Sequence, residues 1–209
     1  MTVDSPLTSD RFSLSEFPDG EFGAYIFDCD GTLADSMPLH YSSWKAAMAS
    51  HGVDFPKALF YSWGGKKGHE IVSHLNALLG TSMDVNETVK KKQLNYLDAV
   101  HGIQPIEIVL AIARQSRGKI PMAVASGGQR RLVEGTLAAI GVLDWFDAVV
   151  CAEDYARGKP EPDPFLETAR RLGVAPEKCL VFEDTETGIQ AATAAGMKYV
   201  LVSDRSATR

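Results

Sequence analysis

The sequence predicts an α/β protein with an open parallel sheet that is covered by helices on both faces. Three observations lead to this fold class: short apolar runs without polar alternation, helical patterns that stop at a glycine, and a purely helical stretch after the first run. Runs of four or five apolar residues are too short for helices and suit strands that are buried on both faces. Strands that alternate with helices of about ten residues are typical of Rossmann-like parallel sheets.

Five apolar runs are the predicted strands. They lie at Ala24–Phe27, Pro121–Ala125, Ala148–Cys151, Cys179–Phe182 and Tyr199–Val202. Helical patterns lie between the later runs, and each is followed directly by glycine, the preferred residue after the last turn of a helix. The predicted helices are Arg130–Ile140, Pro164–Leu172 and Gly188–Ala195.

A helical insertion interrupts this alternation. Residues 38–102 contain no convincing strand, and their helix-like segments are Tyr41–Ser50, His69–Leu79 and Asn86–Val100. Proline and glycine at both edges of the insertion suit hinges between domains. We therefore predict an α/β core domain of residues 21–37 and 103–209, a helical domain of residues 38–102 inserted after the first strand, and an N-terminal extension of residues 1–20.

Composition narrows the class of protein. The net charge of −6 and the sequence pI of about 5.4 argue against a nucleic-acid-binding protein, which usually has a basic face. No apolar stretch approaches the roughly 20 residues of a membrane span, and the first residues lack the apolar region of a signal peptide. The three cysteines are an odd number without a C-x-x-C pair, so we expect reduced thiols in a cytoplasmic protein. A monomer is the expectation for a protein of this size.

Polar residues follow four of the five predicted strands. In an open parallel sheet the carboxyl ends of the strands meet at the edge where ligands bind. These residues are Asp28 and Asp30 after the first run, Ser126 and Gly127 after the second, Lys159 after the third, and Glu183 and Asp184 after the fourth. Converging carboxylates repel unless a cation or a proton separates them. Oxygen ligands without a nearby histidine suit a hard ion, so the pattern indicates Mg²⁺ together with a phosphate-bearing substrate.

Four motifs carry a family resemblance. IFDCDGTLADS, VASGG, GKPEPD and VFEDTETGIQAA occur in this order, with the helical insertion after the first. From about residue 24 to residue 202 the chain thereby resembles the haloacid dehalogenase-like phosphohydrolases. Within them it is most similar to the branch of β-phosphoglucomutase-like enzymes and small sugar-phosphate phosphatases such as fructose-1-phosphate phosphatase. Any one of the motifs alone would be a weak signal, whereas the ordered set is highly specific.

The resemblance implies a Mg²⁺-dependent phosphatase that forms an aspartyl-phosphate on Asp28. Asp30 is then the general acid and base, which protonates the leaving oxygen and afterwards activates water. A carboxylate nucleophile splits one difficult displacement into two easier ones. Asp30 has to give up a proton in the first step and take one up in the second.

The remaining motif residues take binding roles by the same resemblance. Ser126, Gly127 and Lys159 hold the phosphoryl oxygens, and the lysine also offsets the charge of the nucleophile. Mg²⁺ is held by the side chains of Asp28 and Asp184 and by the backbone carbonyl of Asp30, with Glu183 nearby. Structural roles are the alternatives: a helix cap for Ser126, a surface lysine for Lys159, and an N-cap pair for Glu183 and Asp184.

Two residues of the insertion are candidate substrate contacts. His40 corresponds in position to a histidine at the cap entry of phosphoglucomutase-like enzymes, and a packed or solvated histidine is the alternative. Lys67 follows Gly64-Gly65 and would meet the far end of the substrate, unless it is only a solvated residue at a helix start. The insertion as a whole is the expected cap, which covers the site and admits a small phosphorylated molecule.

Phosphatase and mutase activity differ in what the cap has to bind. The cap of β-phosphoglucomutase carries Lys-Gly-x-Ser-Arg, whereas this chain has Trp63-Gly64-Gly65-Lys66-Lys67. Lysine lacks the bidentate fork with which arginine holds a phosphate, so a second phosphate would be held less firmly. Hydrolysis of a sugar phosphate is therefore the preferred function, with a sugar-phosphate mutase as the alternative. A noncatalytic phosphate-binding relative is a third hypothesis, against which the complete set of motif residues argues.

Overall fold

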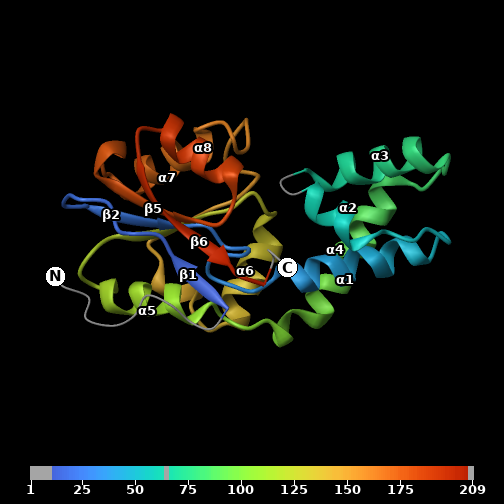
Figure 1. The fold of residues 1–209 in the computed structure, drawn as a ribbon, viewed down its shortest axis with the longest axis horizontal. Coiled ribbons are helices and arrows are strands. Elements are labelled where there is room, and N and C mark those ends of the chain that lie inside the picture. The colour runs from blue at the N-terminus through green and yellow to red at the C-terminus, as the bar shows by residue number, and fades with distance from the viewer. Residues whose placement is uncertain (1–10, 64–65, 207–209) are drawn as a thin grey trace. The chain divides into compact units, whose positions relative to one another are not determined.

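The computed structural model describes residues 11–63 and 66–206, which divide into two compact units (Figure 1). One unit, the core unit, comprises Met1–Asp35 and Gln104–Arg209 and contains the strands of the sheet. The other, the helical unit, comprises Ser36–Ile103. Each unit buries its own clusters of apolar side chains, so each has its own hydrophobic core.

The core unit is built on a mixed sheet of six strands in the order β1-β6-β5-β2-β3-β4. The strands are β1 (Phe12–Leu14), β2 (Ala24–Phe27), β3 (Met122–Ala125), β4 (Ala148–Val150), β5 (Cys179–Glu183) and β6 (Lys198–Asp204). The five predicted strands are confirmed as β2 to β6, and they pair in parallel. The chain adds β3 and β4 on one side of β2 and β5 and β6 on the other, so β2 lies at the point where the strand order reverses.

The prediction of a purely parallel sheet is wrong at one edge. β1 pairs antiparallel with β6, with Phe12 opposite Asp204 and Leu14 opposite Val202. These residues belong to the segment predicted as an extension outside the core. The helical unit therefore follows the second strand of the chain rather than the first. A three-residue edge strand offers a single apolar–polar alternation, which is too little for a sequence pattern to predict.

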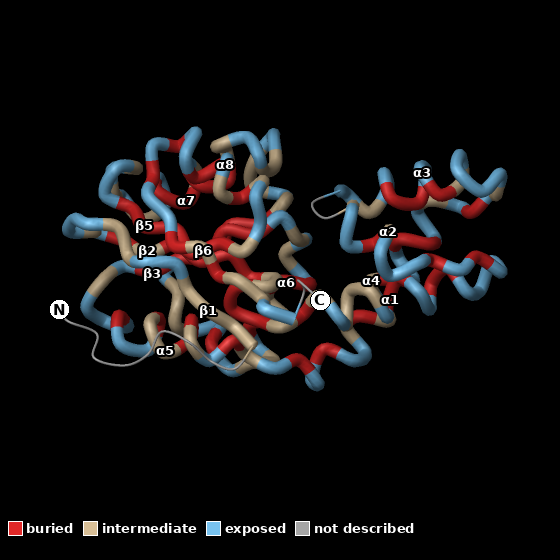
Figure 2. Tube along the Cα trace, viewed as in Figure 1, coloured by how far each residue is buried: buried red, intermediate tan, exposed pale blue. Residues whose placement is uncertain are grey.

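Helices cover both faces of the sheet, and Figure 1 shows α5 and α6 on one face and α7 and α8 on the other. Their bounds are Glu107–Ser116 for α5, Arg130–Ala139 for α6, Asp163–Leu172 for α7 and Glu186–Ala194 for α8. Successive residues of a strand point to opposite faces. In β2, Phe27 accordingly packs in one cluster with Leu110 of α5, and Ile26 in another with Phe165 of α7. The strands are thus buried on both sides, as the red centre of the core unit in Figure 2 shows.

The three helices predicted for the core domain are confirmed as α6, α7 and α8. Gly173 ends α7 in the left-handed conformation, with a φ of +67°, which glycine adopts without strain. α5 is absent from the prediction, because its apolar run IVLAIA has no clear helical period.

The helical unit contains α1 (Met37–Ala49), α2 (Lys57–Ser62), α3 (Gly68–Leu79) and α4 (Val85–Ala99). Its core includes the fully buried side chains of Met48, Phe55 and Leu75. The three predicted helices correspond to α1, α3 and α4, whereas the six-residue helix α2 is too short to show a period. In the part of the chain that the structure describes, no helix combines the length and apolar character that a membrane crossing requires.

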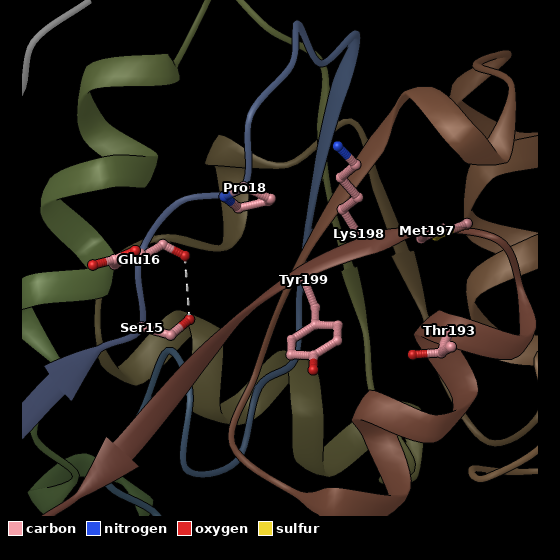
Figure 3. Close-up of a pocket in the computed structure, with 7 residues that line it drawn as sticks. All are labelled: Ser15, Glu16, Pro18, Thr193, Met197, Lys198 and Tyr199. Atoms are coloured by element: carbon pink, nitrogen blue, oxygen red, sulfur yellow. Dashed lines mark hydrogen bonds between the residues drawn. The ribbon is translucent and has the colours of Figure 1, made fainter.

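A shallow groove of about 640 Å³ lies beside the start of β6 (Figure 3). Ser15, Glu16 and Pro18 line it from the segment after β1, and Lys198 and Tyr199 line it from β6. Lys198 and Tyr199 are the first residues of their strand, whereas the polar motif residues follow the ends of theirs. These are opposite edges of a parallel sheet, so the groove is not the predicted site.

Candidate active site

Asp28 directly follows β2 at the carboxyl end of this interior strand. Its backbone N–H donates to the carbonyl of Phe182 in β5 at 2.9 Å. The rings of Phe27 and Phe182 stack with their centroids 4.7 Å apart, so the ends of β2 and β5 are held side by side. The carboxylate of Asp28, a residue only 6% exposed, consequently lies next to those of Glu183 and Asp184.

Lys159 reaches the same edge of the sheet from the loop after β4. Its Nζ lies 2.6 Å from Oδ1 of Asp28 and 3.5 Å from Oε1 of Glu183. Burial alone would lower the pKa of Lys159, but the charges of Asp28 and Glu183 outweigh this effect and hold the pKa above its usual value. Lys159 therefore stays charged at neutral pH and neutralises part of the negative charge around it.

The carboxylates at this edge outnumber the lysine. Burial, together with the charges of Glu183 and Asp184, raises the pKa of Asp28 well above its ordinary range, although Lys159 opposes this shift. Burial and the charge of Glu183 likewise raise the pKa of Asp184 to about 7. Burial is the largest cause of both shifts and the charge of Glu183 adds to it, so a divalent cation bound to these carboxylates would lower both pKa values.

The arrangement of the oxygen atoms fits such a cation. Carboxylate oxygens of Asp28, Glu183 and Asp184 lie within 4.8 Å of one another. Oε2 of Glu183 is buried and has no hydrogen-bond partner among the described residues. A buried acceptor without a donor is costly unless a ligand satisfies it. Closely spaced carboxylate oxygens are ligands that suit Mg²⁺, so the residues present fit the ion that the sequence predicts.

Two glycines, which have no side chain, provide the space that these carboxylates occupy. A Cβ at Gly188 in α8 would lie 1.6 Å from Oε1 of Glu183, and a Cβ at Gly31 would lie 2.3 Å from Oδ2 of Asp184. Thr32, the next residue, donates its hydroxyl to Oδ1 of Asp184 at 3.0 Å. The Gly-Thr pair of the first motif therefore positions Asp184, a role that the sequence alone does not reveal.

Ser126 follows β3 and is 1% exposed. Its N–H donates to the carbonyl of Val150 at 2.9 Å, and its Oγ accepts from the N–H of Gly128 at 3.0 Å. The hydroxyl thus stabilises its own loop and does not cap the following helix α6, whose N-cap residue is Gln129.

Asp30 lies beside this loop, and Gly127 is part of it. Oδ2 of Asp30 is 3.7 Å from the position that a Cβ of Gly128 would occupy. At the exposed Gly127, no described residue other than its two chain neighbours comes within 4 Å of the corresponding position. The structure therefore brings one group of predicted site residues together at the carboxyl end of the sheet. Asp28, Lys159, Glu183 and Asp184 contact one another there, and Asp30 and Ser126 flank the position of Gly128. These six residues, together with Gly127, which is next to Ser126 in the chain, are called the motif cluster.

The two other predicted residues belong to the helical unit. Nδ1 of His40 lies 2.7 Å from Nζ of Lys92, and its ring stacks on Tyr96 at a centroid distance of 4.2 Å. Lys67 is exposed and precedes α3, where its N–H donates to Oε2 of Glu70 at 3.3 Å. The packing of His40 and the exposure of Lys67 are compatible with their structural alternatives, and the substrate contacts of both residues remain predictions.

Comparison with known families places the chain in one of them. A sequence model of the haloacid dehalogenase-like hydrolases matches residues 22–196. This chain belongs to that family. The matched range contains all four motifs of the hydrolase, so the resemblance that they carry is confirmed.

Several relatives of the hydrolase are named as phosphatases. Fructose-1-phosphate phosphatase YqaB of Escherichia coli (strain K12) is 34% identical over 183 residues, which cover 86% of this chain and 95% of the relative. Validoxylamine A 7'-phosphate phosphatase of Streptomyces hygroscopicus subsp. limoneus is 30% identical over 82% of this chain and 81% of its own length. Hexitol phosphatase A of Escherichia coli (strain K12) is 28% identical over 86% of this chain and 82% of its own length.

Solved structures share the fold of the hydrolase. CbbY from Rhodobacter sphaeroides in complex with phosphate superposes with a TM-score of 0.76 at 24% identity, over 85% of this chain and 84% of that one. β-Phosphoglucomutase from Clostridium difficile superposes with a TM-score of 0.73 at 25% identity, over 85% of this chain and 83% of that one. The α/β fold is therefore that of the family.

Proposed function

We propose that this hydrolase is a Mg²⁺-dependent phosphatase that hydrolyses a small phosphorylated metabolite, namely a sugar phosphate, through an aspartyl-phosphate intermediate. The observation that carries the proposal is the buried pair of Asp28 and Lys159, 2.6 Å apart, beside the carboxylates of Glu183 and Asp184. The names of the relatives supply the substrate class, since they include a fructose-1-phosphate phosphatase and a hexitol phosphatase.

Asp28 and Asp30 carry out the two steps of the reaction. A carboxylate oxygen of Asp28 attacks phosphorus, the bond from phosphorus to the ester oxygen breaks, and Asp30 gives its proton to that oxygen. Water then attacks the phosphorus of the aspartyl-phosphate and loses a proton to Asp30. Inorganic phosphate leaves, and the carboxylate of Asp28 and the acid form of Asp30 are restored.

The other residues of the motif cluster bind and orient the phosphoryl group. Lys159, Ser126 and Gly127 hold its oxygens by charge and hydrogen bonds, which fits the position of the first two at the carboxyl end of the sheet. Mg²⁺ would be held by the side chains of Asp28 and Asp184 and the backbone carbonyl of Asp30, with Glu183 as a further ligand. When bound, it offsets negative charge that develops on the phosphoryl oxygens.

The helical unit is the proposed cap of the enzyme, with residues 38–102 as its extent. His40 and Lys67 are the proposed substrate contacts on it, and closure of a cap would exclude bulk water while Asp28 attacks phosphorus. The proposal includes a monomeric enzyme of the cytoplasm, which acts on a small molecule and not on nucleic acid. The three cysteines, all buried and free, are compatible with that compartment.

Phosphate release from a panel of sugar 1-phosphates and 6-phosphates tests the proposal. It is measured with Mg²⁺ and with a chelator, while the sugar product is followed, for the wild type and for Asp28→Asn. We expect Mg²⁺-dependent release from one or a few members and none from the variant, because an amide cannot form the aspartyl-phosphate. Retained activity in a folded Asp28→Asn protein would refute the covalent mechanism. If isomerised sugar forms and little phosphate is released, the enzyme is a sugar-phosphate mutase and not a phosphatase.

A further inference from the structure

The hydroxyl of Tyr155 joins two loops of the candidate active site. Tyr155 precedes Lys159 by four residues in the loop after β4, and Ser126 lies in the loop after β3. Oη of Tyr155 donates to the backbone carbonyl of Ser126 at 3.0 Å. This hydrogen bond connects the loop that carries the lysine to the loop that carries the serine, and a second one runs from the N–H of Ala152 to the carbonyl of Gly128 at 3.0 Å.

The carbonyl of Ser126 needs this donor, because it belongs to a residue that is only 1% exposed. The other polar groups of Ser126 have separate partners, Val150 for its N–H and Gly128 for its Oγ. Outside partners thus hold the loop through the N–H and the carbonyl of Ser126 and the carbonyl of Gly128, and Tyr155 provides the side-chain contact that comes from the loop of Lys159. If the phenol hydroxyl is removed, the carbonyl of Ser126 loses this donor. We then expect the loop to shift so that the carbonyl can accept a hydrogen bond from water.

The segment that carries Tyr155 is itself firmly held. The carboxylate of the preceding residue, Asp154, accepts from the N–H of Cys151 at 2.8 Å and from Arg171 at 2.8 Å, and it also pairs with Arg130. Burial raises the pKa of Tyr155 to about 12, so its hydroxyl keeps the proton that it donates. A Cβ at Gly158 would lie 3.8 Å from Cε2 of Tyr155, which places the ring beside the residue before Lys159.

We propose that Tyr155 is a positioning residue for phosphoryl transfer, which fixes the Ser126–Gly128 loop relative to Lys159 through its hydrogen bond to the carbonyl of Ser126. The inference rests on the proposed function, because that function assigns Ser126 and Lys159 to the phosphoryl oxygens. Tyr155 lies between the second and third motifs and is part of neither. It acts through the loop and does not itself need to contact the substrate.

Tyr155→Phe tests the inference, since it removes only the hydroxyl. The matched control is Tyr41→Phe in the helical unit, where the hydroxyl also donates to a backbone carbonyl, that of Phe55, at 3.1 Å. Both variants lose one tyrosine-to-carbonyl hydrogen bond, so we expect similar decreases in melting temperature. We expect kcat/KM to fall about tenfold in Tyr155→Phe alone, with a comparable rise in the inhibition constant of inorganic phosphate.

The outcomes separate the inference from the proposed function. If the wild type hydrolyses a sugar phosphate and Asp28→Asn does not, but Tyr155→Phe has the kinetic constants of Tyr41→Phe, the proposed function stands and Tyr155 is merely structural. If the wild type releases no phosphate, the proposed function fails. Calorimetric titration with inorganic phosphate then decides the role of Tyr155: weaker binding in Tyr155→Phe than in Tyr41→Phe supports the positioning role, and equal binding overturns it.

Discussion

The carboxylates around Lys159 decide how the candidate site responds to protons and to Mg²⁺. Asp28 and Asp184 are buried together with Glu183, and one lysine faces all three charges. The pKa of Asp184 rises to about 7, from an ordinary value of 3.8, because of burial first and the charge of Glu183 second. Protons and Mg²⁺ are therefore competing ways to reduce the same excess of negative charge.

Stability should consequently depend on pH and on Mg²⁺ together. Between about pH 4 and pH 7 the folded metal-free protein keeps a proton on Asp184 that the unfolded chain has lost, so its free energy of unfolding falls as the pH rises. Mg²⁺ binds the ionised carboxylates, so the rise in melting temperature that it causes should be larger at about pH 8 than at about pH 6. Thermal unfolding with Mg²⁺ or chelator at both pH values measures this difference.

Asp184→Asn is the control for that experiment, because it removes the titrating carboxylate and a proposed ligand. The variant should show a smaller Mg²⁺ effect and a weaker dependence of its metal-free stability on pH. An equal Mg²⁺ effect at both pH values in the wild type would contradict the assignment of Asp184 to the ion.

At the scale of an element, α8 shows how a helix serves the site. Its first turn packs against the carboxylate of Glu183, and Thr185 both caps the helix by accepting from the N–H of Gly188 at 3.0 Å and donates its hydroxyl to Glu183. The helix begins close to the carboxylates because β5 ends at Glu183 and α8 starts three residues later, at Glu186. The same residues thus define the helix start and hold a proposed metal ligand.

The substitution Gly188→Ala distinguishes the effect of helix propensity from the effect of the packing of α8 against Glu183. Alanine in a helix is more favourable than glycine by about 1 kcal/mol, so propensity alone predicts stabilisation. The added Cβ would lie 1.6 Å from Oε1 of Glu183, so we expect destabilisation by about 1–3 kcal/mol instead. Displacement of Glu183 should also weaken Mg²⁺ binding by roughly tenfold or more. Urea unfolding and Mg²⁺ titration measure the two effects.

Gly68→Ala in the first turn of α3 is the matched control. A Cβ there would meet its nearest neighbours at an ordinary 3.4 Å, so the substitution should leave stability unchanged or raise it. A Gly188→Ala protein as stable as Gly68→Ala, with unchanged Mg²⁺ affinity, would show that α8 does not constrain Glu183.

At the scale of the whole molecule, the N-terminal segment that the structure describes, from Arg11 to the end of β1 at Leu14, belongs to the core unit. Arg11, next to β1, donates from Nη2 to Asp204 at the end of β6 at 2.7 Å and to Asp35 at 3.0 Å. Asp35 is the last residue of the core unit before the helical unit, and its N–H donates to the carbonyl of Gln104, where the chain re-enters the core unit. Arg11 therefore ties the edge of the sheet to the point where the chain leaves it.

Arg11→Ala should lower the free energy of unfolding by about 1 kcal/mol, a modest value because the arginine side chain is 41% exposed and water screens its pairs. The difference from the wild type should shrink at high salt, since screening weakens the wild-type pairs. Urea unfolding at low and high salt measures it. Arg170→Ala, which removes a 71% exposed arginine paired within α7, should have a smaller effect. Equal losses in both variants would mean that the N-terminal segment contributes little to the core unit.

By itself the sequence determined the order of the five parallel strands, the helices α6, α7 and α8 and the residues that follow each strand. Strands covered on both faces appear as uninterrupted apolar runs, which local pattern reveals, and β2 to β6 lie within a residue or two of the predicted ranges. Because parallel strands end at one edge, the meeting of Asp28, Lys159 and Asp184 could be inferred before any contact was known. The edge strand β1, the six-residue helix α2 and the apolar helix α5 carried too little pattern to be found.

Only the tertiary structure decided which groups hold those residues in place. The hydrogen bond from Thr32 to Asp184 spans 152 positions of the chain, and that from Tyr155 to Ser126 spans 29. The room that Gly188 leaves for Glu183 depends on the path of a helix against a strand end. Such contacts arise between surfaces that come together on folding, so no local period or residue type encodes them. Secondary structure is encoded locally, whereas the environment of a site is a property of the packed chain.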